Sequence, residues 1–166
     1  MTLQQTNPDA PRWIVASMAL HFESTVNASI TPAPPWSMTG YDLKVGEDDQ
    51  DHIEFRIQGP YLKDIPGWEV WEVPLNFLMT FRQDEVKDNY TLDRWLGVYQ
   101  EALRQPLSVN RLGNGVQDDG TLLGCLTPKK SKREFIRLDR YGYVKDGVAV
   151  QQATVGAVVD LWLEWT

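Results

Sequence analysis

The sequence predicts an α+β fold: a mostly antiparallel sheet with an N-terminal helix and one central helix packed on it. Several short segments alternate apolar and polar side chains, as half-buried strands do. Two further segments place apolar residues at helical spacing, one near the N-terminus and one near residue 95. A chain of 166 residues with no internal repeat and no low-complexity linker is expected to form a single domain over residues 1–166.

The N-terminal region is expected to be a loose tail, residues 1–9, followed by a helix. Pro11 suits the first turn of a helix capped by Asp9 or Ala10. The segment 13–25 alternates as a strand would, but it also carries a helical stripe, and its Ala and Met residues favour helix. We therefore predict a helix for this segment.

Short strands are predicted on either side of an acidic turn. The segment 31–35, Thr-Pro-Ala-Pro-Pro, is a stiff proline connector, because proline excludes a regular helix and a central strand. The segment 41–45 alternates briefly, and the acidic turn 46–51 closes it. Residues 52–57 then alternate cleanly until Gly59-Pro60 stops the strand.

The longest predicted strand runs over residues 68–81 and is followed by the best-defined helix. Pro74 lacks an N–H, so this strand is expected at a sheet edge or with a bulge at the proline. Thr91 is expected to cap the helix, and Pro106 to end it. The apolar stripe of this helix comprises Leu92, Trp95, Leu96, Tyr99 and Leu103.

The C-terminal part is predicted to consist of strands joined by turns. A short extended piece at 107–109 precedes strands at 122–126 and 135–144, and Asp146-Gly147 suits a hairpin turn. The final strand, 154–165, is so apolar that both of its faces must be covered.

Composition excludes several classes of protein. A net charge of −7 argues against nucleic acid as the main ligand, because phosphate binding needs clustered Lys and Arg. The lone cysteine, Cys125, cannot form an intrachain disulfide and is expected to be inert. No apolar run reaches the length of a membrane span, and the N-terminus lacks the order of a signal peptide. We therefore expect a product of the cytoplasm with no membrane partner.

No catalytic residue and no cofactor are predicted. The two histidines, His21 and His52, do not follow a Gly-x-Ser-x-Gly elbow, and structural or surface roles are expected for both. Glu69 and Glu72, spaced by three, would lie on opposite faces of a strand and cannot act as a pair. The turn 113–115, Gly-Asn-Gly, lacks the context of a phosphate-binding loop.

No metal site is predicted either. The acidic residues around the first turn could offer oxygen ligands to calcium, but they lack the internal glycine and the spacing of an EF-hand loop. A solvated turn is the favoured interpretation. These residues are Glu47, Asp48, Asp49, Asp51 and Glu54.

Aromatic and basic residues are the candidates for protein–protein contact. Seven Trp is a high number for this length, and Trp is enriched both in cores and at interfaces. The basic run 129–133 is either a solvated hairpin loop or a contact for an acidic patch on a neighbouring copy. The predicted interface residues are Trp68, Trp71, Phe77, Phe81, Lys129, Lys130, Lys132, Arg133, Trp162 and Trp165.

Three segments carry a resemblance to a known class of proteins. They are Pro11–Ser17, which leads the first helix, Glu54–Pro60 as a strand ending in Gly-Pro, and Trp71–Met79 as an aromatic-to-aliphatic strand. This order of elements resembles tailed-bacteriophage virion proteins of the tail-terminator and tail-completion type. The resemblance spans most of the chain, but it consists of element order and short patches.

The resemblance implies a structural virion protein without turnover. Such a subunit forms a ring, often a hexamer, that caps the tail tube and joins it to the head-proximal connector. Its partners would be its own copies, the tail tube and the connector, with no sequence-specific contact to nucleic acid.

Three alternatives remain open. One is a head–tail adaptor or a tail-tube-like virion subunit. The second is a carbohydrate-binding module that uses Trp36, Trp68 and Trp71 as stacking platforms. The third is an enzyme whose site the sequence does not display.

Overall fold

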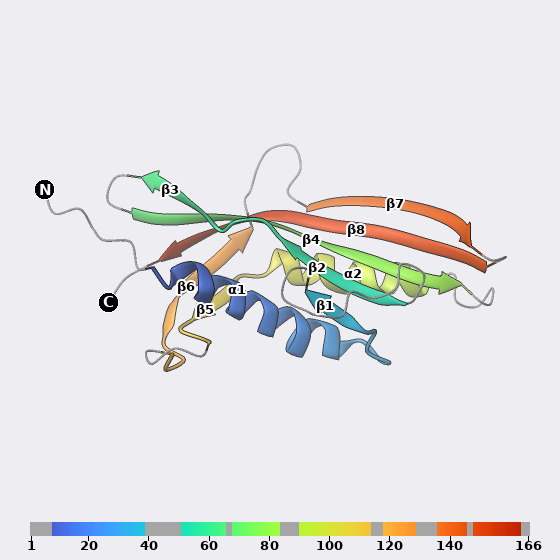
Figure 1. Cartoon of the computed structure of the whole chain (residues 1–166), viewed down its shortest axis with the longest axis horizontal. Coiled ribbons are helices and arrows are strands. Elements are labelled where there is room, and N and C mark those ends of the chain that lie inside the picture. The colour runs from blue at the N-terminus through green and yellow to red at the C-terminus, as the bar shows by residue number, and fades with distance from the viewer. Residues whose placement is uncertain are drawn as a thin grey trace, which may run out of the picture.

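The axis of the fold is a long antiparallel pair of strands, β4 (Trp68–Gln83) and β8 (Val148–Leu163). The computed structural model describes residues 8–38, 51–65, 68–83, 90–113, 118–128, 136–145 and 148–163. The two strands pair continuously, from Glu69 opposite Leu163 to Gln83 opposite Ala149. Figure 1 shows this ribbon running along the longest dimension of the molecule.

Six shorter strands complete one eight-stranded sheet. Its main path has the order β1-β2-β4-β8-β6-β5, while β3 pairs with β4 and β7 pairs with β8. The shorter strands are β1 (Trp36–Met38), β2 (His52–Ile57), β3 (Tyr61–Ile65), β5 (Leu107–Asn110), β6 (Leu122–Pro128) and β7 (Ile136–Lys145). Along β4, β3 and β2 lie on the same side at successive positions, and along β8 the same holds for β6 and β7.

The predicted fold class, a mostly antiparallel sheet with an N-terminal helix and one central helix, is wrong. The sheet is mixed, with a main path of six strands and two α-helices, and strand predominates over helix. The cause is β1, which follows the proline connector and joins β2 in parallel, with Trp36 opposite Ile53. Parallel pairing depends on a crossover between distant segments, so no short-range pattern announces it.

The expectation that Pro74 marks a sheet edge or a bulge is also wrong, because β4 lies inside the sheet. On one side β4 pairs with β8 straight through Pro74, which faces Val158. On the other side, the carbonyl of Pro74 accepts a hydrogen bond of 2.9 Å from the N–H of Gln58, between the ends of β2 and β3. In an antiparallel strand, the backbone N and O of one residue point to the same side. The N–H that Pro74 lacks would therefore point to the gap between the end of β2 and the start of β3, where no strand residue needs it.

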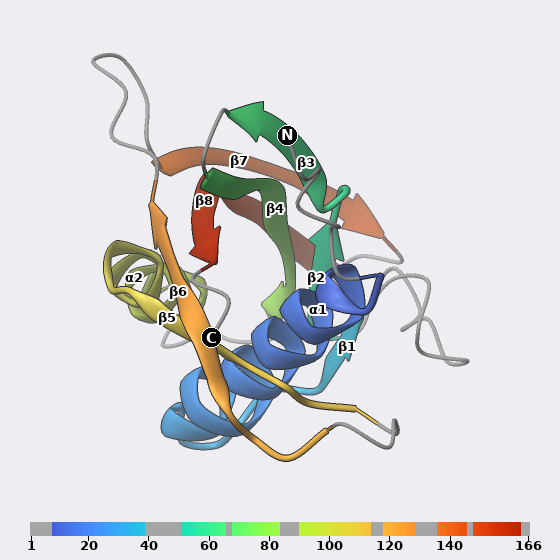
Figure 2. The ribbon, with the colours of Figure 1, turned by 90° about the vertical axis from the view of Figure 1, so that its left-hand side faces the viewer.

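Two α-helices flank the sheet, and Figure 2 shows α1 between β1 and the β5–β6 hairpin. Helix α1 (Ala10–His21) has Pro11 in its first turn, as predicted, and continues into short helical turns over Phe22–Ser29. Helix α2 (Thr91–Arg104) buries all five residues of its predicted stripe and ends just before Pro106. Its N-cap is Tyr90, so the prediction that Thr91 caps this helix is wrong.

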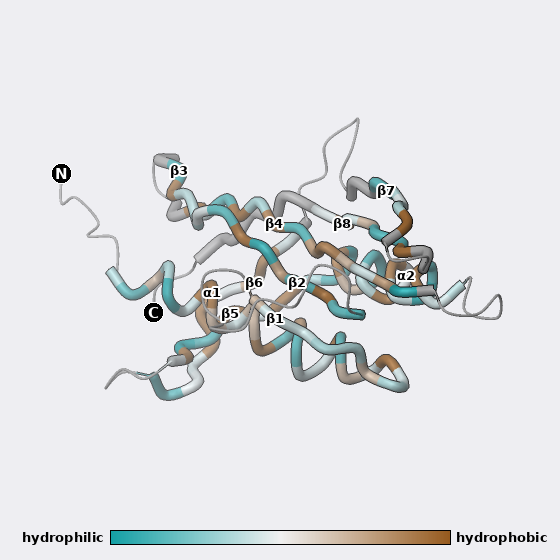
Figure 3. Tube along the Cα trace, turned by 45° about the vertical axis from the view of Figure 1, so that its right-hand side comes forward, coloured by the Kyte–Doolittle hydropathy of each residue, from teal (hydrophilic) through white to brown (hydrophobic). Residues whose placement is uncertain are grey.

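An aromatic cluster fills the centre of the core. The ring of Phe77 on β4 lies 4.5 Å from Tyr99 of α2, 4.7 Å from Phe22 and 5.0 Å from Phe55 of β2, measured between centroids. Phe55, Phe77 and Tyr99 are fully buried. Hydrophobic and hydrophilic residues alternate along the strands in Figure 3, as expected for a sheet that buries one face.

The predicted C-terminal strands are confirmed with shifted bounds. β6 and β7 run over residues 122–128 and 136–145, and the last strand begins at Val148 rather than at residue 154. The strand predicted at 41–45 and most of the acidic turn lie outside the described residues. None of the helices seen in the described chain has the length and hydropathy needed to cross a membrane.

Candidate subunit interface

Three of the predicted interface residues belong to the core instead. Trp71, Phe77 and Phe81 on β4 are 5%, 0% and 6% exposed, which corrects their assignment as contacts for a partner. Their odd positions place them on the strand face that packs against the helices, and Phe81 meets Trp95 of α2 edge-on at 5.6 Å. Buried rings cannot anchor a second subunit without unfolding.

For the other predicted interface residues, the structure gives at most the position of the backbone. Trp68 and Trp162 are strand positions near one end of the ribbon, where Trp68 pairs with Ile65 and Trp162 with Val70. The basic run and the last tryptophan lie outside the described residues: Lys129, Lys130, Lys132, Arg133 and Trp165.

Strand β7 is exposed to solvent over the part whose side chains the structure describes, residues 139–144. It pairs with β8 along its whole length, from Ile136 opposite Ala157 to Lys145 opposite Val148. Residues 139–144 are all exposed, including Tyr141, Tyr143 and Val144. Neighbouring strand residues point to opposite faces, so six consecutive exposed positions mean that solvent reaches both faces of β7 over this stretch.

One ion pair fixes which way β7 faces. Arg140 lies opposite the buried Ala153 in the β7–β8 ladder and forms an ion pair with Asp93 of α2. Even-numbered residues of β7 therefore face the helix side, and Tyr141 and Tyr143 face the other side. Figure 1 shows β7 on the outer side of β8, at the opposite end of the ribbon from β3.

Sequence reasoning identified β7 as a strand but missed it as a surface. The usable signal was limited to the odd positions: Asp139, Tyr141, Tyr143 and Lys145 are polar or aromatic, which indicates that this face is not a core face. The predicted interface was instead centred on tryptophans, because Trp is among the residue types most enriched at interface hot spots.

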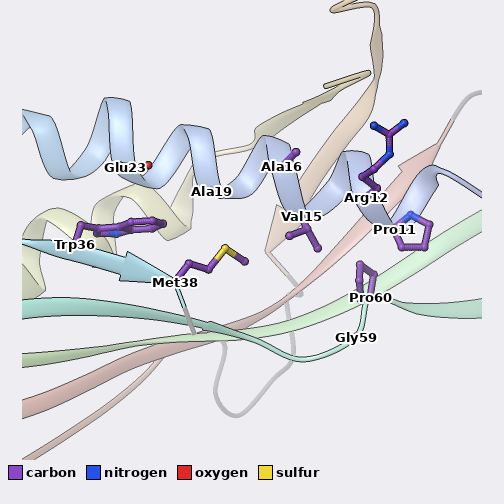
Figure 4. A pocket seen from close by; sticks show the side chains of 10 residues that line it. All are labelled: Pro11, Arg12, Val15, Ala16, Ala19, Glu23, Trp36, Met38, Gly59 and Pro60. Carbon is purple, nitrogen blue, oxygen red and sulfur yellow. The ribbon is translucent and has the colours of Figure 1, made fainter. Parts of the chain in front are cut away.

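A groove of about 500 Å³ opens beside α1 (Figure 4). Its walls are α1 on one side and β1 with the turn before β3 on the other, and most of its lining is apolar. The charged residues in the lining are Arg12 and Glu23, eleven positions apart along the helical segment. The remaining lining residues are Pro11, Val15, Ala16, Ala19, Trp36, Met38, Gly59 and Pro60. Such a lining accepts an apolar group and supplies no nucleophile.

A buried carboxylate positions the helix that forms this groove. Asp118, whose side chain is 4% exposed, accepts hydrogen bonds of 2.6 and 3.1 Å from the guanidinium of Arg12. The indole N–H of the fully buried Trp13 donates to the same carboxylate at 2.6 Å. One turn later, the hydroxyl of Ser17 accepts from the N–H of Asn110 at 2.9 Å. These contacts hold α1 against β5 and the segment after it.

The histidines do not assemble a catalytic set. His21 ends α1 against the ring of Phe22 at 5.2 Å, and burial lowers the pKa of its imidazole. His52 begins β2, is buried and lies opposite Thr80.

The acidic candidates are engaged in ordinary structural contacts. Asp51 accepts a hydrogen bond of 2.6 Å from the backbone N–H of Arg82, and Glu54 pairs with Arg56 at 2.8 Å. Glu72 pairs with Lys63 of β3 at 2.5 Å. Within the described part of the chain, no group of three or more His, Cys, Asp or Glu residues is placed to hold a metal ion.

Two of the three tryptophans considered for sugar stacking are placed by the structure. Trp71 is buried, so it offers no open ring face. Trp36 is partly buried against the ring of Phe55, with centroids 6.0 Å apart, and its indole nitrogen is buried without a hydrogen-bond partner among the described atoms. A flat aromatic platform is therefore not formed at these two positions.

Comparison with known proteins gives little. No protein family matches the chain, and no curated protein matches it. One solved structure, which carries no functional description, resembles it with a TM-score of 0.47 and 12% sequence identity, over 93% of this chain and 96% of that one. A likeness this weak supports no argument about fold or function.

Proposed function

We propose that this protein is a structural virion subunit of the tail-terminator type. Its copies form a ring, a hexamer in the simplest case, that caps a tail tube and joins it to the head-proximal connector. It acts by burying surface against other subunits and turns over no substrate. The observation that carries this proposal is strand β7, whose residues 139–144 are all exposed to solvent.

A bare strand is costly unless another protein covers it. Strand edges present unpaired backbone groups, and soluble proteins usually shorten, bulge or cover them. β7 is ten residues long and contains no proline. Its exposed tyrosines add the kind of side chain that is enriched at interfaces. An assembly of subunits gives this strand a function.

The choice of assembly rests on the order of elements. The N-terminal helix, the strand ending in Gly59-Pro60 and the aromatic-to-aliphatic strand resemble tail-terminator and tail-completion proteins. The basic run 129–133 immediately precedes β7 in the sequence, while the chain as a whole carries a net charge of −7. A neighbour that covers β7 would therefore bring its acidic surface within reach of this run.

Native mass spectrometry and negative-stain microscopy of the full chain test the proposal. At micromolar concentration, alone or with any tail-tube protein encoded beside it, we expect ring-shaped particles of defined stoichiometry. Monomers under both conditions would refute the ring. Neighbouring reading frames for tube, tape-measure or capsid proteins would support the virion role, and metabolic neighbours would argue against it.

The basic run provides a second, independent test. Replacing Lys129, Lys130, Lys132 and Arg133 by glutamine is expected to weaken assembly and to flatten its dependence on salt, because surface charge pairs are screened by salt. The charge-matched comparison is between a variant that replaces only Lys129 and Lys130 and a control that replaces two exposed arginines of α2, Arg94 and Arg104, all by glutamine. Equal effects of the two variants would show that only net charge matters.

A further inference from the structure

We propose that the groove between α1 and β1 is a docking site for an extended segment of a partner protein, one that carries a lysine or arginine beside apolar side chains. This contact goes beyond the proposed ring. The groove is lined by residues of α1, the turn after it, β1 and the turn before β3, and it contains no residue of β7.

Helix α1 is held from one side and faces the groove on the other. Toward β5, the hydroxyl of Ser17 accepts from the N–H of Asn110 at 2.9 Å and donates to its carbonyl at 3.2 Å. Asp118 binds Arg12 and Trp13 from the same direction. Figure 2 shows the helix lying between β1 and the β5–β6 hairpin. Because its polar contacts come from the β5 side, the helix leaves the groove toward β1 open.

The length and volume of the groove suit an extended chain. Arg12, Ala16, Ala19 and Glu23 recur at helical spacing and line it together. The first and last of them are eleven residues, about 16 Å, apart, which about five extended residues span. Over this length, a volume of about 500 Å³ gives a cross-section of about 30 Å², less than half that of a helix ~10 Å across. The groove is therefore too narrow to seat a whole helix.

The charges at the two ends of the groove favour a basic partner. At one end, the guanidinium of Arg12 already pairs with Asp118 at 2.6 Å and with Asp9 at 3.4 Å. Two carboxylates thus surround one cation, and an acidic partner would gain little there. At the other end, Glu23 is exposed, and no ion pair engages its carboxylate in the described part of the chain. Trp36 lines the same end, below Glu23 in Figure 4. A cation bound here gains both charge pairing and attraction to the indole ring.

The middle of the groove sets the rest of the partner's sequence. Its lining between the charged ends is apolar, with Val15, Ala19, Met38 and Pro60 among its members. In an extended chain, every second side chain faces the same way. The bound segment is therefore expected to present one basic and two apolar side chains at alternate positions.

Peptide titration of the full chain tests this prediction. The probes are two blocked peptides, Ac-Lys-Ala-Leu-Ala-Leu-NH2 and its reverse, Ac-Leu-Ala-Leu-Ala-Lys-NH2. One of them is expected to bind with a Kd of about 0.1–1 mM and to shift the backbone NMR signals of Ala16 and Ala19. Glutamine in place of the peptide lysine should weaken binding about fivefold, and glutamate more than about tenfold. Equal affinities for lysine and glutamine peptides, or shifts confined to other parts of the molecule, would overturn the proposal.

Two variants and their controls locate the contacts. Glu23→Gln should abolish the preference for the lysine peptide, whereas Glu101→Gln, at an exposed acid of α2, should preserve it. Ala19→Phe fills the groove and should weaken every peptide at least tenfold. Leu20→Phe, at the next and more exposed position of α1 outside the lining, should not. Circular dichroism checks that each variant is folded, and Ala19→Leu replaces Ala19→Phe if the larger ring prevents folding. Equal effects within either pair would refute the site.

The outcomes separate this site from the ring. A chain that assembles into rings but binds neither peptide would overturn the docking site and leave the ring standing. A chain that binds the lysine peptide in the groove, yet stays monomeric alone and with any tail-tube protein, would support the docking site and refute the ring.

Discussion

Arg12 and Asp118 form a two-pronged ion pair across 106 residues of sequence, with donor–acceptor distances of 2.6 and 3.1 Å. The carboxylate also accepts the indole N–H of Trp13. One acidic side chain thus ties the first turn of α1 to the segment between β5 and β6. The wall of the apolar groove depends on this anchor.

Asp118→Ala is expected to destabilise the fold through Trp13. The substitution leaves the indole N–H of a fully buried ring without its acceptor, which costs roughly 1–3 kcal/mol. Urea denaturation followed by tryptophan fluorescence measures the change. The control is Asp9→Ala, which removes the exposed partner of Arg12 at 3.4 Å and should have little effect. Equal losses from the two variants would show that the buried acceptor has no special role.

Two glycine substitutions are expected to change stability in opposite directions. Gly113 has φ +142°, and a Cβ there would lie 2.4 Å from Nη1 of Arg12, so Gly113→Ala should destabilise by about 1 kcal/mol or more. Gly97 lies within α2 with nothing near its Cβ position, so Gly97→Ala should stabilise by about 0.5–1 kcal/mol. Thermal unfolding midpoints of the two variants measure these changes. Midpoint shifts of the same sign would contradict the expected opposite effects of Gly113→Ala and Gly97→Ala.

Phe77→Ala should act on folding and not on association. It empties the centre of the aromatic cluster and is expected to cost about 3–5 kcal/mol, with Phe77→Leu costing less. Tyr141→Ala, at an exposed position, should change the stability of the monomer by less than about 0.5 kcal/mol and weaken assembly with other subunits instead. Denaturation curves and sedimentation of the same samples separate the effects. A folded, monomeric Phe77→Ala variant of normal stability would restore the view that this ring is an interface anchor.

Alkaline pH should destabilise the protein through Tyr99. Its hydroxyl donates to Asn27 Oδ1 at 3.2 Å, and burial raises its pKa above the ordinary value of 10.0. A raised folded-state pKa leaves stability intact below pH 10. As the pH rises above that value, the unfolded chain loses its proton first and stability falls.

Urea midpoints at pH 8 and pH 11 test this dependence. Tyr99→Phe should lose about 1 kcal/mol at pH 8 with its hydrogen bond, and it should then fall less between the two pH values than the unsubstituted chain does. Tyr90→Phe, at an exposed position, serves as the control. Parallel falls in all three proteins would exclude Tyr99 as the source.

Short-range patterns predicted the helices better than the sheet. The stripe of α2 was predictable because a 3.6-residue period brings its members together within one segment. The parallel pairing of β1 with β2 and the central place of β4 depend on contacts between remote segments, for which one sequence holds no local signal. Arg12 and Asp118 could not be paired from the sequence for the same reason.

The interface was mispredicted for a different reason. Trp71, Phe77 and Phe81 share their strand parity with the apolar Val73, Leu75 and Met79, and this parity already indicated a buried face. The prediction gave more weight to the aromatic residue type than to the strand parity, and it therefore assigned three core rings to a surface. On β7, the same rule identifies the odd positions from Asp139 to Lys145, which are polar or aromatic, as a face outside the core.

The central position of β8 has a consequence for how the chain is made. This strand joins β4, β6 and β7 in a single sheet, yet it is the last of the eight to be synthesised. Until residue 163 leaves the ribosome, one side of β4 has no partner over fifteen positions, from Glu69 to Gln83. The nascent polypeptide therefore passes through a stage in which a long apolar strand is open to aggregation, and a chaperone or rapid completion of translation must protect it.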